Sequence, residues 1–169
     1  MKTNLQFASF IFALFTVLLG TSCYSLRGID IDPNVNTYFV DQFRNNASNA
    51  PPSLPQTFTE ALKEKIRTES RLIYADTDPD ISFKGSIVDF RVTSEAPQPG
   101  ETTSLNRLTI TTAIEYIHAK DEKKGWKSNF SFFYDFPSST DLGSIQDDAI
   151  DVISKQMMED IFNKAFTNW

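Results

Sequence analysis

Apolar and polar residues alternate along the chain in two rhythms, one typical of strands and one typical of helices. Period-two alternation marks four extended segments, which are residues 36–43, 81–92, 104–119 and 126–136. Apolar residues three or four positions apart mark two helical segments, residues 57–70 and 144–168. The order is β-α-β-β-β-α, with a short strand or extended link at residues 71–75. It predicts an α+β fold, a two-layer sandwich of two helices on a mainly antiparallel four-stranded sheet.

The strand over residues 81–92 changes phase near its middle. Phe83 and Ile87 share one face, whereas Val88, Phe90 and Val92 continue the apolar face only after a shift of one residue. A β-bulge produces such a shift because it inserts one extra residue into a strand. We therefore expect a bulge at Val88, with Val88, Phe90 and Val92 turned towards the core.

The two predicted helices differ in the signals that define them. Thr57 and Glu60 have the spacing of a capping box at the start of the first helix, which we expect to end near Ser70. The apolar stripe of the second helix is formed by Ile145, Ala149, Val152, Ile153, Met157, Ile161 and Ala165. Phe162 and Trp169 extend this face, and we expect Phe162 to be buried in the core. The alternative is that this face is exposed and docks on a partner.

The first 23 residues combine an apolar run with the only cysteine of the sequence. The run begins at Phe7 and is shorter than the roughly 20 apolar residues that a membrane-spanning helix needs. Small residues and then Cys23 follow it, as in a bacterial lipobox. This resemblance implies cleavage before Cys23, whose sulfur would hold diacylglycerol. We expect residues 1–22 to be a lipoprotein signal peptide, residues 23–35 a lipidated cysteine with a tether, and residues 36–169 one α+β domain.

Composition narrows the classes of partner. The chain has 16 basic and 22 acidic residues, and Lys2 is the only charged residue among the first 22. The mature chain would therefore have a net charge of −7, which argues against general nucleic-acid binding. A cysteine bearing diacylglycerol and acyl chains would attach it stably to a membrane, at about 0.8 kcal/mol per buried CH₂.

Candidate catalytic and metal-binding residues are sparse. His118 is the only histidine, and we expect it at the surface or in a turn. Asp76, Asp78 and Asp80 alternate as at the start of a calcium loop, but Ile81 stands where such a loop needs glycine. A solvated acidic turn is the favoured interpretation. The pattern thus predicts no enzyme, no metal site and no cofactor other than the lipid at Cys23.

Aromatic residues gather on one face of the last predicted strand, at Trp126, Phe130, Phe132, Tyr134 and Phe136. Such a row is usually the core beneath two helices. It could also line a lipid pocket, and the sequence leaves both interpretations open.

Several segments resemble one protein family. The stretches "SLPQTFTEALKEKI", "LNRLTIT" and "MMEDIFNKAFTNW", after a lipobox ending in Cys-Tyr-Ser, are similar to the LptE family of the Bacteroidetes group. The resemblance covers essentially the mature chain. It implies a sandwich of two helices on a four-stranded sheet, and a non-enzymatic lipoprotein of lipopolysaccharide assembly. It also implies that the protein plugs the LptD-type β-barrel, helps the barrel to assemble, and assists lipopolysaccharide transport.

An acidic protein that handles an anionic glycolipid needs local positive charge. Arg107 lies on the polar side of its predicted strand, and Arg91 would lie near it if the two strands pair. Arginine can bind phosphate, so both are candidate contacts for lipid or partner. The alternative is that each is solvated or paired with a neighbour such as Glu115.

Two further expectations concern location and function class. Surface-exported lipoproteins of the Bacteroidetes group resemble one another in an acidic stretch just after the cysteine. Residues 24–28 contain Arg27 and no acidic run, so the comparison implies that the domain faces the periplasm from the outer membrane. A periplasmic ligand-binding lipoprotein of another envelope transport system remains the alternative function.

Overall fold

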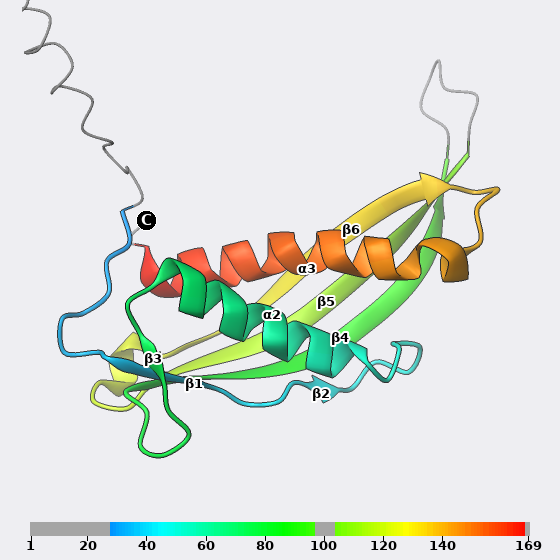
Figure 1. Cartoon of the computed structure of the whole chain (residues 1–169). Helices are drawn as coiled ribbons and strands as arrows, with labels where there is room; N and C mark the ends of the chain where they lie inside the picture. Colours follow the sequence, from blue (N-terminus) through cyan, green and yellow to red (C-terminus); the bar gives the residue numbers. More distant parts are fainter. Residues whose placement is uncertain (1–27, 97–103, 168–169) are drawn as a thin grey trace, which may run out of the picture.

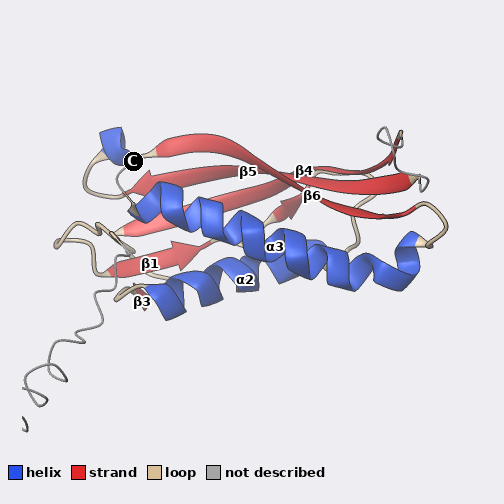
Figure 2. Cartoon of the chain, turned by 90° about the horizontal axis from the view of Figure 1, so that it is seen from above, coloured by secondary structure: helices blue, strands red, loops and turns tan. Residues whose placement is uncertain are grey.

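The computed structural model describes residues 28–96 and 104–167. Cys23 and Trp169, for which the sequence makes predictions, lie outside these ranges. Two helices lie side by side on one face of a twisted sheet (Figure 1), and the view from above shows that they cover this face alone (Figure 2). The predicted two-layer α+β fold is therefore confirmed.

The elements follow the predicted order, with short additions. The strands are β1 (Thr37–Val40), β2 (Arg44–Asn45), β3 (Ile73–Tyr74), β4 (Ile81–Glu95), β5 (Leu105–His118) and β6 (Trp126–Pro137). The helices are α2 (Leu54–Glu69), the short 3₁₀ helix η1 (Glu122–Lys124) and α3 (Leu142–Phe166).

The sheet has six strands, where the sequence predicted four. Its order is β3-β1-β4-β5-β6, with β2 pairing separately on β4. The three long strands β4, β5 and β6 form an antiparallel meander, whereas β1, β2 and β3 make parallel pairs. The two additional strands contain two residues each. Strand β3 falls within the short strand or extended link expected at residues 71–75, whereas β2 is too short to produce a readable alternation.

The predicted bulge is present in β4. The register against β5 shifts between Ile87 and Asp89, so Val88 is the extra residue. Phe90 is buried as expected, but Val88 is 40% exposed and Val92 is 42% exposed, so the assignment of these two valines to the core is wrong. The bulge turns Val88 outward, and Val92 lies farther towards the end of the β4–β5 hairpin.

The start of α2 also differs from the prediction. The helix begins at Leu54, three residues before Thr57, with Pro55 in its first turn. Proline suits this position because its φ is already helical and its missing N–H would have no partner there. The Thr57 hydroxyl donates to the Ser53 carbonyl instead of forming a capping box, and Glu60 pairs with Lys63. The predicted end near Ser70 is confirmed.

The helix α3 supplies much of the core. Ile153, Met157, Ile161 and Phe162 are each no more than 1% exposed, which confirms the core assignment of Phe162. Val152, by contrast, is 43% exposed and does not belong to the buried stripe.

The segment that precedes β1 is held against the C-terminal end of α3. Ile29 forms a bridge with Thr167, and the N–H of Asp30 donates to the carbonyl of Phe166 at 2.7 Å. Val35 is buried. The N-terminal segment therefore contacts the fold from residue 29 onward.

Candidate functional site

The face of the sheet opposite the helices, called here the open face, displays both candidate arginines. On β5 the residues Leu108, Ile110 and Ile114 are buried beneath the helices, so the alternating residues point to the open face. Arg107 is among them. Beyond the bulge, Arg91 on β4 has the same orientation because Phe90 is buried.

Arg107 is held by neighbours on β5's two flanking strands. Its Nε donates to Asp135 Oδ1 at 2.7 Å and its Nη2 donates to Asp135 Oδ2 at 2.8 Å. Glu95 lies 3.9 Å away, and the guanidinium stands 3.9 Å from the centre of the Phe133 ring. The Arg107 guanidinium holds the pKa of Asp135 below its usual value. Arg107 is thus paired with a neighbour, as in the alternative interpretation, but this neighbour is Asp135, because Glu115 forms its ion pair with Lys127.

Arg91 lies diagonally across from Arg107. Strands β4 and β5 pair Arg91 with Thr109 and Thr93 with Arg107, which places the arginines one pleat apart. Arg91 forms an ion pair with Asp89 on its own strand. The two cations therefore lie together on the open face, each with an acidic neighbour.

The aromatic row of β6 lies at the margin of the core. Phe136 is buried, whereas Trp126, Phe130, Phe132 and Tyr134 are partly buried and pack against the core. Because β6 is the last strand of the sheet, its inward residues have neighbours on one side only. The row is thus core on one side and accessible on the other.

A hollow of about 510 Å³ lies where the entering chain meets the end of α3. Tyr116 and Trp126 stack along its wall with ring centres 5.5 Å apart, and Lys164 stands over Trp126. Burial raises the pKa of Tyr116 to about 12, so its phenol stays protonated near neutral pH. Asp32 and Lys124 form an ion pair at 2.6 Å at the same hollow.

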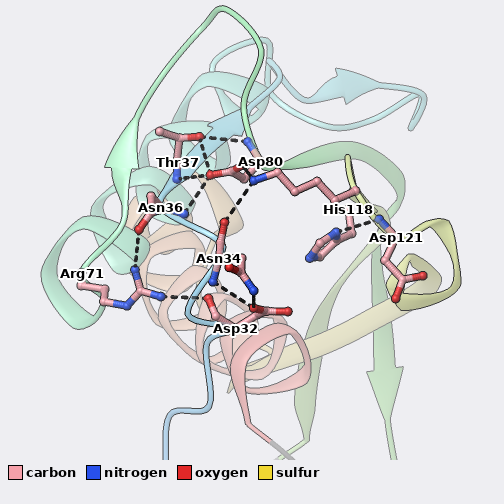
Figure 3. A network of polar contacts seen from close by, with 9 residues as sticks. Asp32, Asn34, Asn36, Thr37, Arg71, Asp80, His118 and Asp121 are labelled. Carbon is pink, nitrogen blue, oxygen red and sulfur yellow. Dashed lines mark hydrogen bonds and ion pairs between the residues drawn. The ribbon is translucent and has the colours of Figure 1, made fainter.

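His118 lines this hollow and is buried, at 5% exposed, so the expected surface position is wrong. Its Nδ1 accepts a hydrogen bond from the N–H of Asp121 at 3.1 Å (Figure 3). The remaining ring nitrogen, Nε2, is buried without a hydrogen-bond partner among the described residues. Since Nδ1 is the acceptor, neutral His118 has its proton on Nε2. The hollow that His118 lines is also lined by Asp32 and Val35, which lie more than 80 residues earlier in the chain, so the sequence around His118 gives no sign of these neighbours.

Asp80 differs from the other aspartates of its turn. It accepts hydrogen bonds from the N–H of Asn36 at 2.9 Å and from the N–H and hydroxyl of Thr37, both at 3.1 Å (Figure 3). Lys120 pairs with it at 2.7 Å. Lys120 and these backbone donors hold the pKa of Asp80 well below its ordinary value. Asp80 therefore fixes the start of β1 and is not a solvated turn residue.

The described part of the chain contains neither a group of metal ligands nor a membrane-spanning helix. Within residues 28–96 and 104–167, no three histidine, cysteine or acidic side chains are grouped so that they could hold a metal ion. No helix in the same ranges has the length and apolar character needed to cross a membrane.

Comparison with known protein families shows the family of this chain. The family model described as LptE, lipopolysaccharide-assembly, matches residues 35–165, which is nearly the whole described domain. The chain belongs to the LptE family. This membership connects it to lipopolysaccharide assembly in the cell envelope. Among curated proteins, no significantly similar relative was found.

Solved structures of similar fold come from several bacteria. A Helicobacter pylori homologue of neuraminyllactose-binding haemagglutinin is 10% identical, with a TM-score of 0.56 over 85% of this chain and 90% of that chain. The PelC dodecamer of Paraburkholderia phytofirmans is 9% identical, with a TM-score of 0.49 over 83% and 95%. A minor lipoprotein of Acinetobacter baumannii is 5% identical, with a TM-score of 0.49 over 76% and 91%. The first shows a shared fold alone, and the two lower scores support no inference.

Proposed function

We propose that this LptE-family chain is a non-enzymatic lipoprotein of the outer membrane, anchored by diacylglycerol and acyl chains at Cys23. In this proposal it plugs an LptD-type β-barrel, helps the barrel to assemble, and assists the passage of lipopolysaccharide. The observation that supports it most is the family match, because that match spans residues 35–165. The lipobox-like run before Cys23 supports the anchor independently.

The anchor is tested at the N-terminus of the native protein. Mass spectrometry of protein extracted from membranes is expected to find a chain that begins at Cys23 and bears lipid. The Cys23→Ser variant is expected to remain unprocessed or to be released from the membrane. An unmodified thiol at Cys23 in the native protein contradicts this part of the proposal.

The barrel partnership is tested by isolation of the native complex from outer membranes. A stoichiometric complex with one large β-barrel, resistant to detergent, is the expected result. The protein alone, or bound to unrelated envelope proteins, contradicts the proposal. Protease added to intact cells tests whether the domain faces the periplasm or the cell surface, since a periplasm-facing domain resists digestion until the outer membrane is opened.

The open face offers the proposed contact for the anionic glycolipid. Arg107 and Arg91 lie on neighbouring strands, diagonally across from each other, and arginine can bind phosphate. Each arginine has an acidic neighbour within the chain, so a lipid phosphate would have to replace a carboxylate. In this proposal, binding is an exchange of acceptors, in which a lipid phosphate takes the place of Asp135 or Asp89 beside the arginine.

One observation favours a second candidate, a periplasmic lipoprotein that binds a small ligand for another transport system. The hollow at the end of α3 contains the unpartnered His118 Nε2 and the cation Lys164. A ligand with a hydrogen-bond acceptor would satisfy the imidazole after a small movement of the loop around Asp32. Native mass spectrometry separates the candidates, because a retained small molecule without a barrel supports this second function.

A further inference from the structure

The hollow at the end of α3 contains a buried polar group without a partner. His118 is 5% exposed, and its Nε2 forms no hydrogen bond with any described residue. Its Nδ1 accepts a hydrogen bond from the N–H of Asp121, so Nε2 of the neutral ring bears the proton and is a donor (Figure 3). A buried donor without an acceptor is costly, and nearly all such groups in native proteins have a partner. The hollow therefore offers a hydrogen bond that the described chain does not use.

A cation lines the same hollow. Lys164 reaches it from α3, with its ammonium 5.3 Å from the centre of the Trp126 ring, and it forms no ion pair within the described part of the chain. Lys124, the second lysine of the hollow, pairs with Asp32 and also feels the charge of Asp30, so its charge is already balanced. One donor and one cation are thus left for a ligand, and together they select an anionic group with acceptor atoms.

The size and shape of the hollow suit a ligand with one ring. Tyr116 and Trp126 stack with their ring planes 20° apart and give the hollow a flat aromatic wall. Tyr116 and His118 lie two residues apart on the buried face of β5, so their β-carbons are separated by about 7 Å. A single ring can therefore contact the aromatic wall while a substituent reaches His118. The volume of about 510 Å³ lies within the usual range of ligand pockets.

The polar part of the wall narrows the class of ring. The carboxylates of Asp30 and Asp32 line the hollow beside the phenol of Tyr116, which stays protonated because burial raises its pKa to about 12. An aromatic acid would bury these groups without partners, whereas the hydroxyl groups of a sugar can bond to them. A sugar ring also has an apolar face of C–H groups that can lie flat on an aromatic ring.

We propose that this hollow binds a free sugar acid, a monosaccharide that carries one carboxylate. The sugar ring lies on the wall of Tyr116 and Trp126, and the two carboxylate oxygens accept a hydrogen bond from His118 Nε2 and pair with Lys164. This ligand class rests on the second candidate function for its site. It is independent of the barrel partnership, because every group that it uses lies within this chain.

The segment of residues 30–35 opposite His118 must shift for the carboxylate to reach Nε2, which is covered. Exposed polar contacts hold this segment in place, such as the pair of Lys124 with Asp32 and the bond from Lys120 to the carbonyl of Asn34. Exposed ion pairs contribute little to stability, so the shift costs little.

Nuclear magnetic resonance of the imidazole tests the site in the full-length protein. His118 is the only histidine, so labelled histidine gives one set of ring signals. In a detergent without a sugar headgroup, the free ring is expected to have its proton on Nε2, and glucuronate is expected to shift the Nε2 signal to saturation. Glucose lacks the carboxylate and benzoate lacks the hydroxyl groups, so each is expected to bind at least about tenfold more weakly. Absence of a saturable shift with glucuronate, or equal binding of glucose or benzoate, overturns the proposal.

A substitution of Lys164 tests the anionic contact. Lys164→Met keeps an unbranched apolar side chain over Trp126 but removes the charge, and it is expected to weaken glucuronate binding by about tenfold. Lys164→Arg is expected to restore most of this loss. Lys155→Met is the matched control, since Lys155 lies on the same helix, pairs with Asp151 and does not line the hollow. Equal affinity of Lys164→Met and Lys155→Met for glucuronate overturns the proposal.

The outcome is distinguishable from failure of either candidate function. The purified protein contains no barrel, so loss of barrel capture and loss of sugar binding are separate results. Native mass spectrometry of protein extracted from membranes tests the ligand class directly, and a retained sugar acid is the expected result. A retained molecule of another chemistry, together with no binding of glucuronate, would support the second candidate function and overturn this ligand class.

Discussion

Arg107 and Asp135 face each other across β5 and β6 and form two hydrogen bonds, at 2.7 Å and 2.8 Å. If lipopolysaccharide phosphate binds by replacing this carboxylate, the acid competes with the ligand. Asp135→Asn removes the competing charge and is expected to tighten binding several-fold, whereas Arg107→Ala is expected to weaken it. Binding of the purified protein to lipopolysaccharide, measured at low and at raised salt, checks both directions.

Lys127→Ala is the matched control for this pair of variants. Lys127 is also on the open face and also paired with an acid, Glu115, but it lies at the far end of β6 from Arg107. It is expected to leave binding unchanged. If Arg107→Ala binds as tightly as the wild type, Arg107 serves only to join β5 to β6 and the proposed contact is wrong.

The surroundings of Asp80 lead us to expect that the folded protein loses stability in acid. The pKa of Asp80 is lowered in the folded state by Lys120 and by the N–H groups of Asn36 and Thr37. A lowered pKa means that the native state favours the ionised form, so this stabilisation is fully present above the unfolded pKa of about 4. It is lost as the pH falls below that value towards the folded pKa. The wild-type protein is therefore expected to lose urea stability more steeply below about pH 4 than Asp80→Asn does.

At neutral pH the same variant is expected to be less stable than the wild type by about 1–3 kcal/mol, because charged acceptors make the stronger hydrogen bonds. Asp78→Asn is the control. Asp78 lies in the same turn, is exposed, and has a φ of 46°, a conformation that asparagine tolerates well. It is expected to match the wild type throughout. Parallel pH profiles for all three proteins contradict the role given to Asp80.

Most of the fold could be predicted from the sequence, since long elements produce long patterns. The alternation of β5 placed Leu108, Ile110 and Ile114 inward, as the structure shows. The phase change revealed the bulge, but not its effect, because a bulged residue belongs to neither face and Val88 turned outward. A short strand such as β2 gains its structure from β4, the neighbour it pairs with, and the local sequence contains no record of that neighbour.

The candidate site was less predictable, for a different physical reason. Alternation placed Arg107 on the polar face, but its partner Asp135 lies 28 residues away and depends on the register of β5 against β6. His118 lines a hollow together with a segment more than 80 residues earlier in the chain. The sequence around Asp80 indicates a solvated turn residue, but in the fold its carboxylate accepts hydrogen bonds from the N–H groups of Asn36 and Thr37 at the start of β1. Contacts made between distant segments leave no local pattern.

Gly85 is expected to tolerate no side chain. It lies within β4, where glycine is otherwise unfavourable, and a β-carbon added there would meet the ring of Phe43 at 2.4 Å. Phe43 is itself 3% exposed and cannot swing into solvent. Gly85→Ala is expected to lower the free energy of unfolding by about 1–3 kcal/mol, the usual cost of overpacking.

A second substitution tests whether the clash is the cause. Phe43→Leu replaces the ring that occupies the space above Gly85 with a smaller side chain. The double variant is therefore expected to lose less stability than the sum of the losses in the two single variants. Gly28→Ala is the control, since nothing lies within 4 Å of its added carbon. Strict additivity in urea unfolding would show that Gly85 is needed for another reason.

Phe162 separates a core role for the C-terminal helix from a docking role. The side chain is 1% exposed and packs against Phe166 with ring centres 4.9 Å apart, while the ammonium of Lys65 lies 5.5 Å from its ring centre. Phe162→Ala is expected to lower the free energy of unfolding by about 3–5 kcal/mol, a large part of the ~5–15 kcal/mol typical of a domain. Val152→Ala, on the exposed side of the same helix, is expected to change the melting temperature little. Barrel capture by Phe162→Ala, measured below its melting temperature, is expected to persist, because the ring is already covered within the chain. An unchanged melting temperature together with lost capture would instead assign this face of α3 to the partner.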